Sequence, residues 1–408
     1  MLAPSRRLRL APRAAATPLA VTPFALGFRP FFLLVGLEGC AAVALWLCVL
    51  AGWVPAPAWL TPSLWHAHEM LFGLVAAAIA GFLLTAVPNW TGAPPVRGPA
   101  LAGLAGLWLA GRVSMALAGL LPAALVALVD VAFLAALALA VGRPVLAARQ
   151  LRNFGVIGIV AALGLANLAT HLDALGLAPG AAPVALHGAV ALAILLVSTI
   201  GGRIVPSFTA NALRGAGVAA PVRPHGALDR AALALLALWV ACELVAPRSA
   251  ASGVAALAAG LASAARMAGW QTRRTLGEPL LWSLHLGLAW VSVGLAAIAA
   301  ADLTGAVPWT VGLHALTTGA IGTMILAVMT RVALGHTGRP LAAPPAATLA
   351  YALVSAAALA RTLGTLAWPN AALRVLTVSG ALWIGAFAVF TAGYAPILLR
   401  PRVDGRPG

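Results

Sequence analysis

The stretch WHAHEMLFGLVAAAIAGFLLTAVPNW, residues 65–90, decides the fold class. From Met70 to Trp90 it carries no charged side chain. An apolar run of about 20 residues is the length that a helix needs to cross the hydrocarbon core of a bilayer. The stretch therefore predicts a transmembrane helix, and its two histidines and one glutamate stand where hydrocarbon should begin.

The composition of the whole chain agrees with this reading. Of the 408 residues, 62% are hydrophobic and 8% are charged, and the mean hydropathy is +1.00. So few charges cannot cover the surface of a soluble protein of this size, which predicts an all-α integral membrane protein embedded in the lipid bilayer. The net charge of +16 is expected to lie in the loops and not to bind nucleic acid.

Gly, Pro and Arg separate the apolar windows from one another, and these windows predict a bundle of about twelve transmembrane helices. We expect one transmembrane domain over residues 25–400, between cytoplasmic tails at 1–24 and 401–408. Arginines concentrate in alternate loops and in both tails, which predicts cytoplasmic termini. The predicted spans are 29–53, 65–88, 99–119, 121–142, 153–173, 183–203, 228–246, 250–270, 279–301, 309–333, 344–366 and 372–399.

Three of these spans resemble one another. Each begins with a histidine (His68, His187 or His314), continues through Gly-rich apolar sequence, and ends near a Val-Pro or Arg-Val pair. Successive histidines are roughly 120 residues apart, which corresponds to four helices. The spacing predicts a threefold repeat of four helices, with the equivalent helices meeting around one interior.

The leading histidines are the predicted metal ligands. His66, His68, His187 and His314 are expected at one depth, and imidazole suits iron, copper and zinc. Glu69 is expected to orient one imidazole by a hydrogen bond. His66 and His68 are about 200° apart on a regular helix, so both face one metal only if the first turn is irregular. The alternative is that these histidines form hydrogen bonds at the membrane interface.

A second polar set lies at the opposite ends of the spans and predicts cofactor binding. Guanidinium groups match carboxylates such as haem propionates, although arginines at inner helix ends also serve as topological anchors. His285 lies about 9 Å from that face and needs a separate partner. The predicted cofactor-binding residues are Arg29, Asn89, Arg203, His285, Arg331 and His336.

Three further charged or titratable groups lie outside these sets. His171 ends a span beside Asp173 and is interpreted either as a site residue or as a surface residue. Arg112 and Asp130 face each other across a predicted helical hairpin and are interpreted as an ion pair.

Several chemistries have no motif in the chain. The cysteines Cys40, Cys48 and Cys242 form neither Cys-x-x-Cys nor Cys-x-x-Cys-His, which argues against thiolate zinc sites and covalent haem. Walker, dinucleotide-binding, Gly-x-Ser-x-Gly and His-Glu-x-x-His motifs are also missing from the sequence. The sequence therefore gives no support to hydrolase or ATPase activity.

Five stretches between residues 27 and 340 carry a family resemblance: GFRPFFLL, WHAHEMLFGLVAAAIAGFLLTAVPNWTG, GGRIVPSFTAN, HLGLAW and HALTTGAIGTMILAVMTRVALGHTGRP. These motifs resemble those of the NnrS family. This resemblance implies a multi-pass protein of the bacterial inner membrane that binds non-covalent haem and copper and acts in nitric oxide metabolism or protection against nitrosative stress. It assigns no catalytic residue and does not decide whether the protein is an enzyme. The histidine placement is also similar to that of haem-copper oxidase catalytic subunits, an analogy that does not carry function.

The sequence therefore predicts a haem- and copper-binding protein whose small-molecule partner is nitric oxide or a relative of it. The alternative is a twelve-helix solute permease without metal cofactors. Such permeases usually show six-plus-six repeats with broken helices at the midplane, whereas the repeat here is of four helices. A membrane sensor is a third interpretation, and the sequence has no appended signalling domain to support it.

Overall fold

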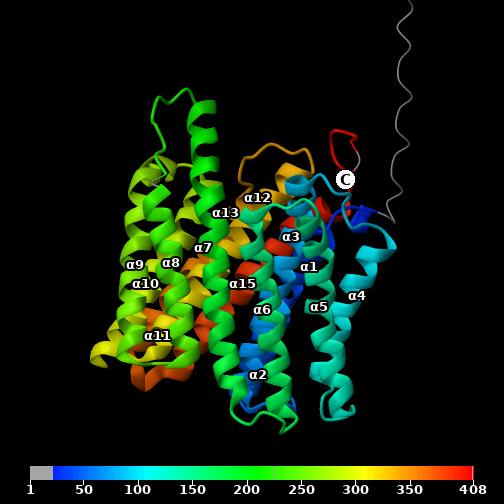
Figure 1. Cartoon of the computed structure of the whole chain (residues 1–408), viewed down its shortest axis with the longest axis vertical. Helices are drawn as coiled ribbons and strands as arrows, with labels where there is room; N and C mark the ends of the chain where they lie inside the picture. The colour runs from blue at the N-terminus through cyan, green and yellow to red at the C-terminus, as the bar shows by residue number, and fades with distance from the viewer. Residues whose placement is uncertain (1–21, 225, 407) are drawn as a thin grey trace, which may run out of the picture.

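The computed structural model describes residues 22–224, 226–406 and 408, and these residues form an all-α bundle without a strand (Figure 1). Most of the predicted N-terminal tail, residues 1–21, lies outside the described residues. Residues 22–24 form a short 3-10 turn, η1 (Thr22–Phe24). The fold class predicted from composition is therefore confirmed.

The helices follow the predicted spans in order, and η2, η5 and η6 are π-helical turns. Their bounds are α1 Phe28–Leu50, α2 Pro62–His68, η2 Glu69–Val75, α3 Ala76–Thr91, α4 Pro99–Ala116, α5 Ala123–Ala147, α6 Leu151–Ala174, α7 Ala181–Gly215, α8 Gly226–Val245, α9 Ala250–Met267, η3 Ala268–Trp270, η4 Thr272–Thr275, α10 Pro279–Thr304, α11 Trp309–His314, η5 Ala315–Gly322, α12 Thr323–His336, α13 Pro345–Leu359, η6 Ala360–Gly364, α14 Thr365–Ala367, η7 Pro369–Ala371 and α15 Ala372–Leu399.

Proline and glycine set many of these boundaries. The helices α2, α4, α10 and α13 begin at a proline, whose missing N–H and fixed φ suit the first helical position. Gly92 ends α3 at φ 73° and Gly305 ends α10 at φ 66°, a left-handed conformation that glycine adopts without steric cost. These local signals are the reason that the spans could be located from the sequence.

Ten helices within the described residues are long and apolar enough to cross a membrane. The helices α4 and α8 are not among these ten. Of the two, α8 carries Asp229, Arg230 and Glu243, and α4 carries the buried Arg112. The predicted number of about twelve is reached only if α4 and α8 are added to the ten.

The helix α7 is longer than its predicted span, 183–203. It continues to Gly215 as one helix of 35 residues, with Pro206 inside it. Proline ends most helices in water, but helices within a membrane bundle tolerate it because neighbouring groups satisfy the freed backbone carbonyl. The expectation that the Val-Pro pair marks the end of this helix was therefore wrong.

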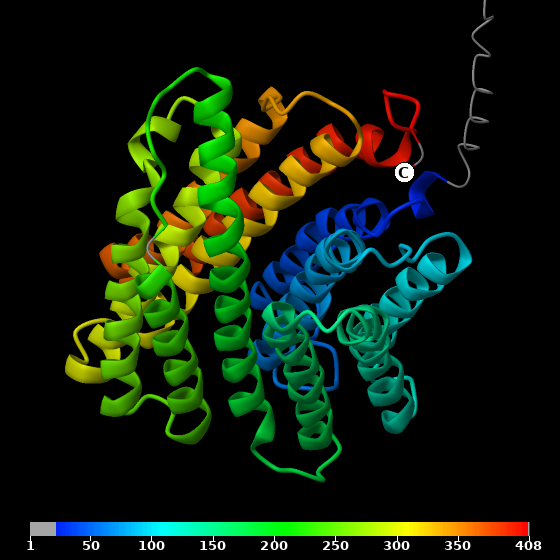
Figure 2. The ribbon, with the colours of Figure 1, turned by 45° about the horizontal axis from the view of Figure 1, so that its top comes forward.

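The three helices of the proposed repeat contact one another near the centre of the bundle. These are the continuous helix α2–η2–α3, the helix α7, and the continuous helix α11–η5–α12. Figure 2 shows α7, the long green helix, between the blue-to-teal helices from the first part of the chain and the yellow-green helices α8–α10. This contact brings residues from distant parts of the sequence around one cavity.

Candidate functional site

A cavity of about 520 Å³ lies among α1, α2, α7, α11 and α15, at the end of the bundle opposite the C-terminus (Figure 1). Its walls are mostly Leu, Val, Trp and Met side chains, and the turns η2, η5 and η6 all contribute to them. π-helical turns inside α-helices occur frequently at functional sites. Three of the four predicted metal-ligating histidines, His66, His187 and His314, line this cavity.

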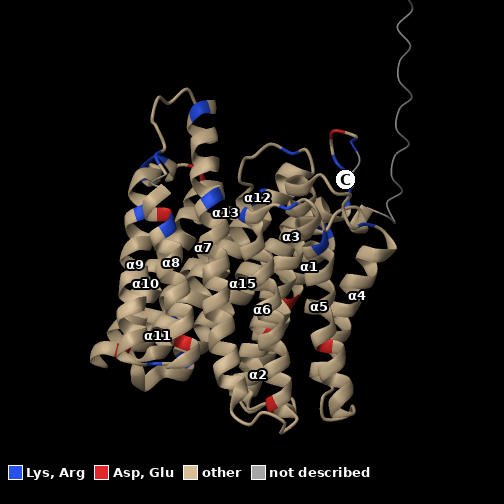
Figure 3. Cartoon of the chain, viewed as in Figure 1, with Lys and Arg blue, Asp and Glu red and all other residues tan. Residues whose placement is uncertain are grey.

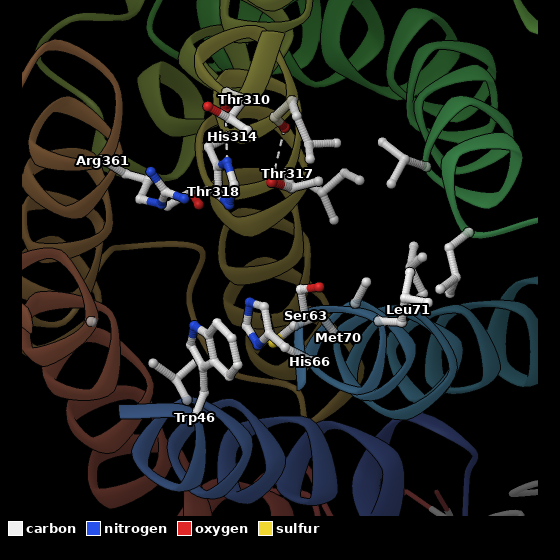
Figure 4. Close-up of a pocket in the computed structure, with 18 of the residues that line it drawn as sticks. Trp46, Ser63, His66, Met70, Leu71, Thr310, His314, Thr317, Thr318 and Arg361 are labelled. Atoms are coloured by element: carbon white, nitrogen blue, oxygen red, sulfur yellow. Dashed lines mark hydrogen bonds between the residues drawn. The ribbon is translucent and has the colours of Figure 1, made fainter. Parts of the chain in front are cut away.

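His314 is held in the tautomer that a metal ligand requires. Its Nδ1 lies 2.8 Å from the backbone carbonyl oxygen of Thr310. The carbonyl can only accept, so Nδ1 carries the proton and Nε2 keeps its lone pair. Metal-binding histidines commonly donate their second N–H to a backbone carbonyl in this way. The side chain of His314 points into the cavity (Figure 4).

His66 projects into the same space from the opposite wall (Figure 4). Its ring stacks on Trp46 with centroids 4.7 Å apart. Its Nδ1 is buried and has no hydrogen-bond partner among the described residues. His187 packs edge-on against Trp309, also at 4.7 Å, and no described residue forms a hydrogen bond with its ring. The histidines that line the cavity therefore keep ring nitrogens free for a ligand.

His68 does not line the cavity, and it is fully buried in a cluster of charged side chains on the other side of its helix. There His68 lies 2.9 Å from Glu69 and 3.3 Å from Asp130. Arg112 contacts both carboxylates, at 2.8 Å for Glu69. The expectation that His68 shares a site with His187 and His314 was therefore wrong. His66 faces the cavity, and His68, two residues further along the helix, points about 200° away from it.

His171 completes this cluster and is buried, so its interpretation as a surface residue was wrong. The Nε2 of His171 lies 2.9 Å from Asp130, and its Nδ1 accepts a hydrogen bond from Trp59. The ion pair predicted between Arg112 and Asp130 is present. The ligand atoms of His68, Asp130 and His171 lie within 4.8 Å of one another, a spacing that could hold a metal ion.

The hydrogen bonds of the cluster show how these atoms are occupied in this structure. Trp59 can only donate, so Nδ1 of His171 accepts and its Nε2 carries the proton facing Asp130. The amide nitrogen of Asn167 donates to Asp130, so its oxygen faces Nε2 of His68. Both nitrogens of His68 thus face acceptors and carry protons. Protons therefore occupy the positions in which a metal would bind His68 and His171.

The cluster combines groups of both signs, and Glu38 is a third carboxyl within electrostatic range of Arg112. The Arg112 guanidinium and the doubly protonated His68 face the carboxylates of Glu69 and Asp130. A buried ion pair is tolerated when its partners are hydrogen-bonded and neutralise one another. The cluster thus functions as a structural connection between η2, α4, α5 and α6, and Glu69 orients His68 within it instead of a histidine at the cavity.

The second predicted set does not reach the cavity either, because its arginines already have partners. Arg29 donates to the backbone carbonyls of Leu398 and Arg400, each at 2.8 Å. Arg203 donates to Asn153 at 2.9 Å. Arg331 lies over the ring of Phe208, 4.2 Å from its centroid.

The other members of that set have local partners as well. His285 lies 2.9 Å from the hydroxyls of both Thr209 and Thr272. The amide of Asn89 donates to the carbonyl of Thr85, and the ring of His336 packs 5.7 Å from that of Phe28.

Two arginines at the cavity, Arg248 and Arg361, were missed as site residues. Arg361 lies inside an apolar span, and a charge in such a position is itself a signal of function. Arg248 lies between the predicted spans 228–246 and 250–270, where an arginine gives no signal of a site. The packing of Trp46 against His66 has no signature in the sequence either.

A search among curated proteins found no match to the chain. The model of the NnrS protein family matches residues 22–402, nearly the whole chain, and the chain therefore belongs to the NnrS family.

Proposed function

We propose that this protein binds haem and copper in the cavity lined by His66, His187 and His314, and acts there on nitric oxide. The observation that carries the proposal is the set of free imidazole nitrogens around one apolar cavity, with His314 already in the ligating tautomer. Membership of the NnrS family supports a membrane protein related to nitric oxide.

The cavity suits a haem in size and in chemistry. Its volume of about 520 Å³ lies within the range of roughly 300–1,000 Å³ that is typical of small-molecule and cofactor sites. Its walls are apolar, as a porphyrin face requires, and imidazole is a ligand for both haem iron and copper. A haem iron and a copper ion bound there would supply the metal centres that bind nitric oxide.

The chain itself would control access to these metals. A second cavity of about 90 Å³ shares Val75 and Ile321 with the first. Only apolar residues line it, among them Phe32, Phe82 and Met324. Nitric oxide is small and nearly apolar, so an apolar space of this kind would accept it more readily than ions or water. This feature supports a gas as the substrate more than a polar solute of a permease.

We also propose that the protein lies in the bacterial cytoplasmic membrane with both termini in the cytoplasm. Figure 3 shows that the arginines, which are the only basic residues coloured there, concentrate at the end of the bundle that holds the C-terminus. This distribution supports the orientation through the positive-inside rule. In this orientation the cavity lies toward the periplasmic side.

The test is an absorption spectrum and metal analysis of the protein purified in detergent. We expect a Soret band, stoichiometric copper, and a shift of the Soret band when nitric oxide is added without oxygen. His66→Ala, His187→Ala and His314→Ala should each lose haem or copper, because removal of a direct ligand abolishes or grossly weakens metal binding.

His285→Ala is the matched control, because His285 is buried but lies among threonines. It should retain wild-type haem and copper. A wild-type protein without a Soret band and without copper would refute the proposed function and favour a permease.

A further inference from the structure

Every ionisable side chain that lines the main cavity is basic. These residues are the three histidines together with Arg248 and Arg361, and no aspartate or glutamate belongs to the lining. Two permanent positive charges thus face an apolar space inside a membrane protein. A site of this kind is complementary to an apolar ligand that carries negative groups at one edge.

Arg361 is the stronger of the two observations. It lies in η6, and its side chain extends beside His314 and Thr318 at the cavity (Figure 4). Its guanidinium forms no hydrogen bond or ion pair with any described residue, although it lies within electrostatic range of His66 and His314. A charge without a partner inside a span is costly, so this position is poised for an anion.

Arg248 presents the second positive charge from the loop between α8 and α9. Its guanidinium lies over the ring of Trp309, 4.8 Å from the centroid, and Trp309 also packs against His187. The backbone of Arg248 is left-handed, with φ 56°, which is uncommon for a residue other than glycine. The stacking on Trp309 fixes the planar group at the cavity edge. Glu243 and Asp302 lie within electrostatic range of Arg248, but neither forms an ion pair with it.

We infer that Arg361 and Arg248 bind the carboxylates of the haem, so that the propionate edge faces the end of the bundle opposite the C-terminus. This inference rests on the proposed function. Guanidinium and carboxylate groups form paired, charge-assisted hydrogen bonds. Arg29 and Arg203 at the other end are already bonded to the protein, so they do not compete for this role.

The experiment compares haem with haem dimethyl ester, in which both carboxylates are neutral. The full-length protein is purified from haem-depleted cells and titrated with each porphyrin, and the Soret band reports the dissociation constant. The wild type should bind haem more tightly than the ester. Arg361→Leu should weaken haem binding by roughly 10- to 100-fold, as expected for a lost charge-assisted hydrogen bond, while binding of the ester should change little.

Arg361→Lys and Arg203→Leu are the controls. The lysine variant keeps the charge and should retain part of the preference for haem, and Arg203→Leu should behave as the wild type. Equal weakening of haem and ester in Arg361→Leu would show that Arg361 only shapes the cavity, and this would overturn the inference. Unchanged haem binding in both Arg361→Leu and Arg248→Leu would overturn it as well. A wild type that binds neither porphyrin would instead refute the proposed function itself.

Discussion

His66 and His68 are separated by one residue and have different surroundings. His66 stacks on Trp46 at the cavity, whereas His68 is enclosed by Glu69, Asp130 and Asn167. The rotation of about 200° between these two positions directs one imidazole to the cavity and the other to the charge cluster. The residues therefore have different tasks, one at the candidate metal site and one in the structural connection between helices.

Asp130→Asn tests this division at the residue scale. The substitution removes one charge from a buried cluster and leaves Arg112 and His68 with a single carboxylate partner in direct contact, Glu69. Breaking a buried charge pair in this way typically costs about 3–5 kcal/mol of folding free energy. We expect a lower unfolding temperature in detergent, measured by tryptophan fluorescence. The copper content per folded protein should be unchanged.

Asp404→Asn is the control for this variant, because Asp404 pairs with Arg402 in a partly exposed turn. Exposed pairs contribute little to stability, so its unfolding temperature should match that of the wild type. Loss of copper in Asp130→Asn, with His187→Ala retaining it, would move the metal site to the charge cluster.

At the scale of elements, the walls of the cavity depend on close contacts between helices. The helix α10 packs against α11 and η5 at glycines, where no side chain separates the backbones. Gly312 lies two residues before His314, and a Cβ added there would come within 2.7 Å of the backbone nitrogen of Ile298. Small residues allow such approaches between membrane helices, so this contact sets the position of His314.

Gly312→Ala should therefore destabilise the protein and lower the amount of haem that the cavity retains. The backbone of α10 cannot move aside cheaply, and overpacking of this kind costs about 1–3 kcal/mol. The measurement is the unfolding temperature in detergent together with haem retained after purification.

Gly106→Ala is the control, since a Cβ on Gly106 of α4 would meet no atom within 4 Å. It should leave both quantities unchanged or raise the stability slightly. A stable Gly312→Ala protein with full haem content would contradict this account of the packing.

At the scale of the whole molecule, the distribution of arginines predicts the orientation in the membrane. Reporter fusions after Arg402 and within residues 214–223 should be active only with a cytoplasmic reporter, and fusions within residues 51–61 only with a periplasmic one. The loop at 51–61 joins α1 to α2, near the cavity. Periplasmic activity at Arg402 would invert the orientation and place the cavity on the cytoplasmic side.

The sequence by itself determined the fold class and most helix boundaries. Apolar length, proline at helix starts and glycine at helix ends are local properties, and each acts within a few residues of the boundary it sets. The sequence also indicated the three histidines that line the cavity, since His66, His187 and His314 are titratable groups near the ends of apolar spans. A buried titratable group in a membrane span is rare enough to be noticed without a structure.

Only the tertiary structure decided which of these groups meet. It separated His68 from His66, placed both His68 and His171 against Asp130, and brought Arg361 to the cavity. The π-helical turns η2, η5 and η6 change the facing of the side chains along their helices, and no local sequence signal identified them. Residues such as Arg361 and His66 are far apart in the chain, so their placement around one cavity depends on how whole helices pack. Spacing along the sequence does not specify that packing.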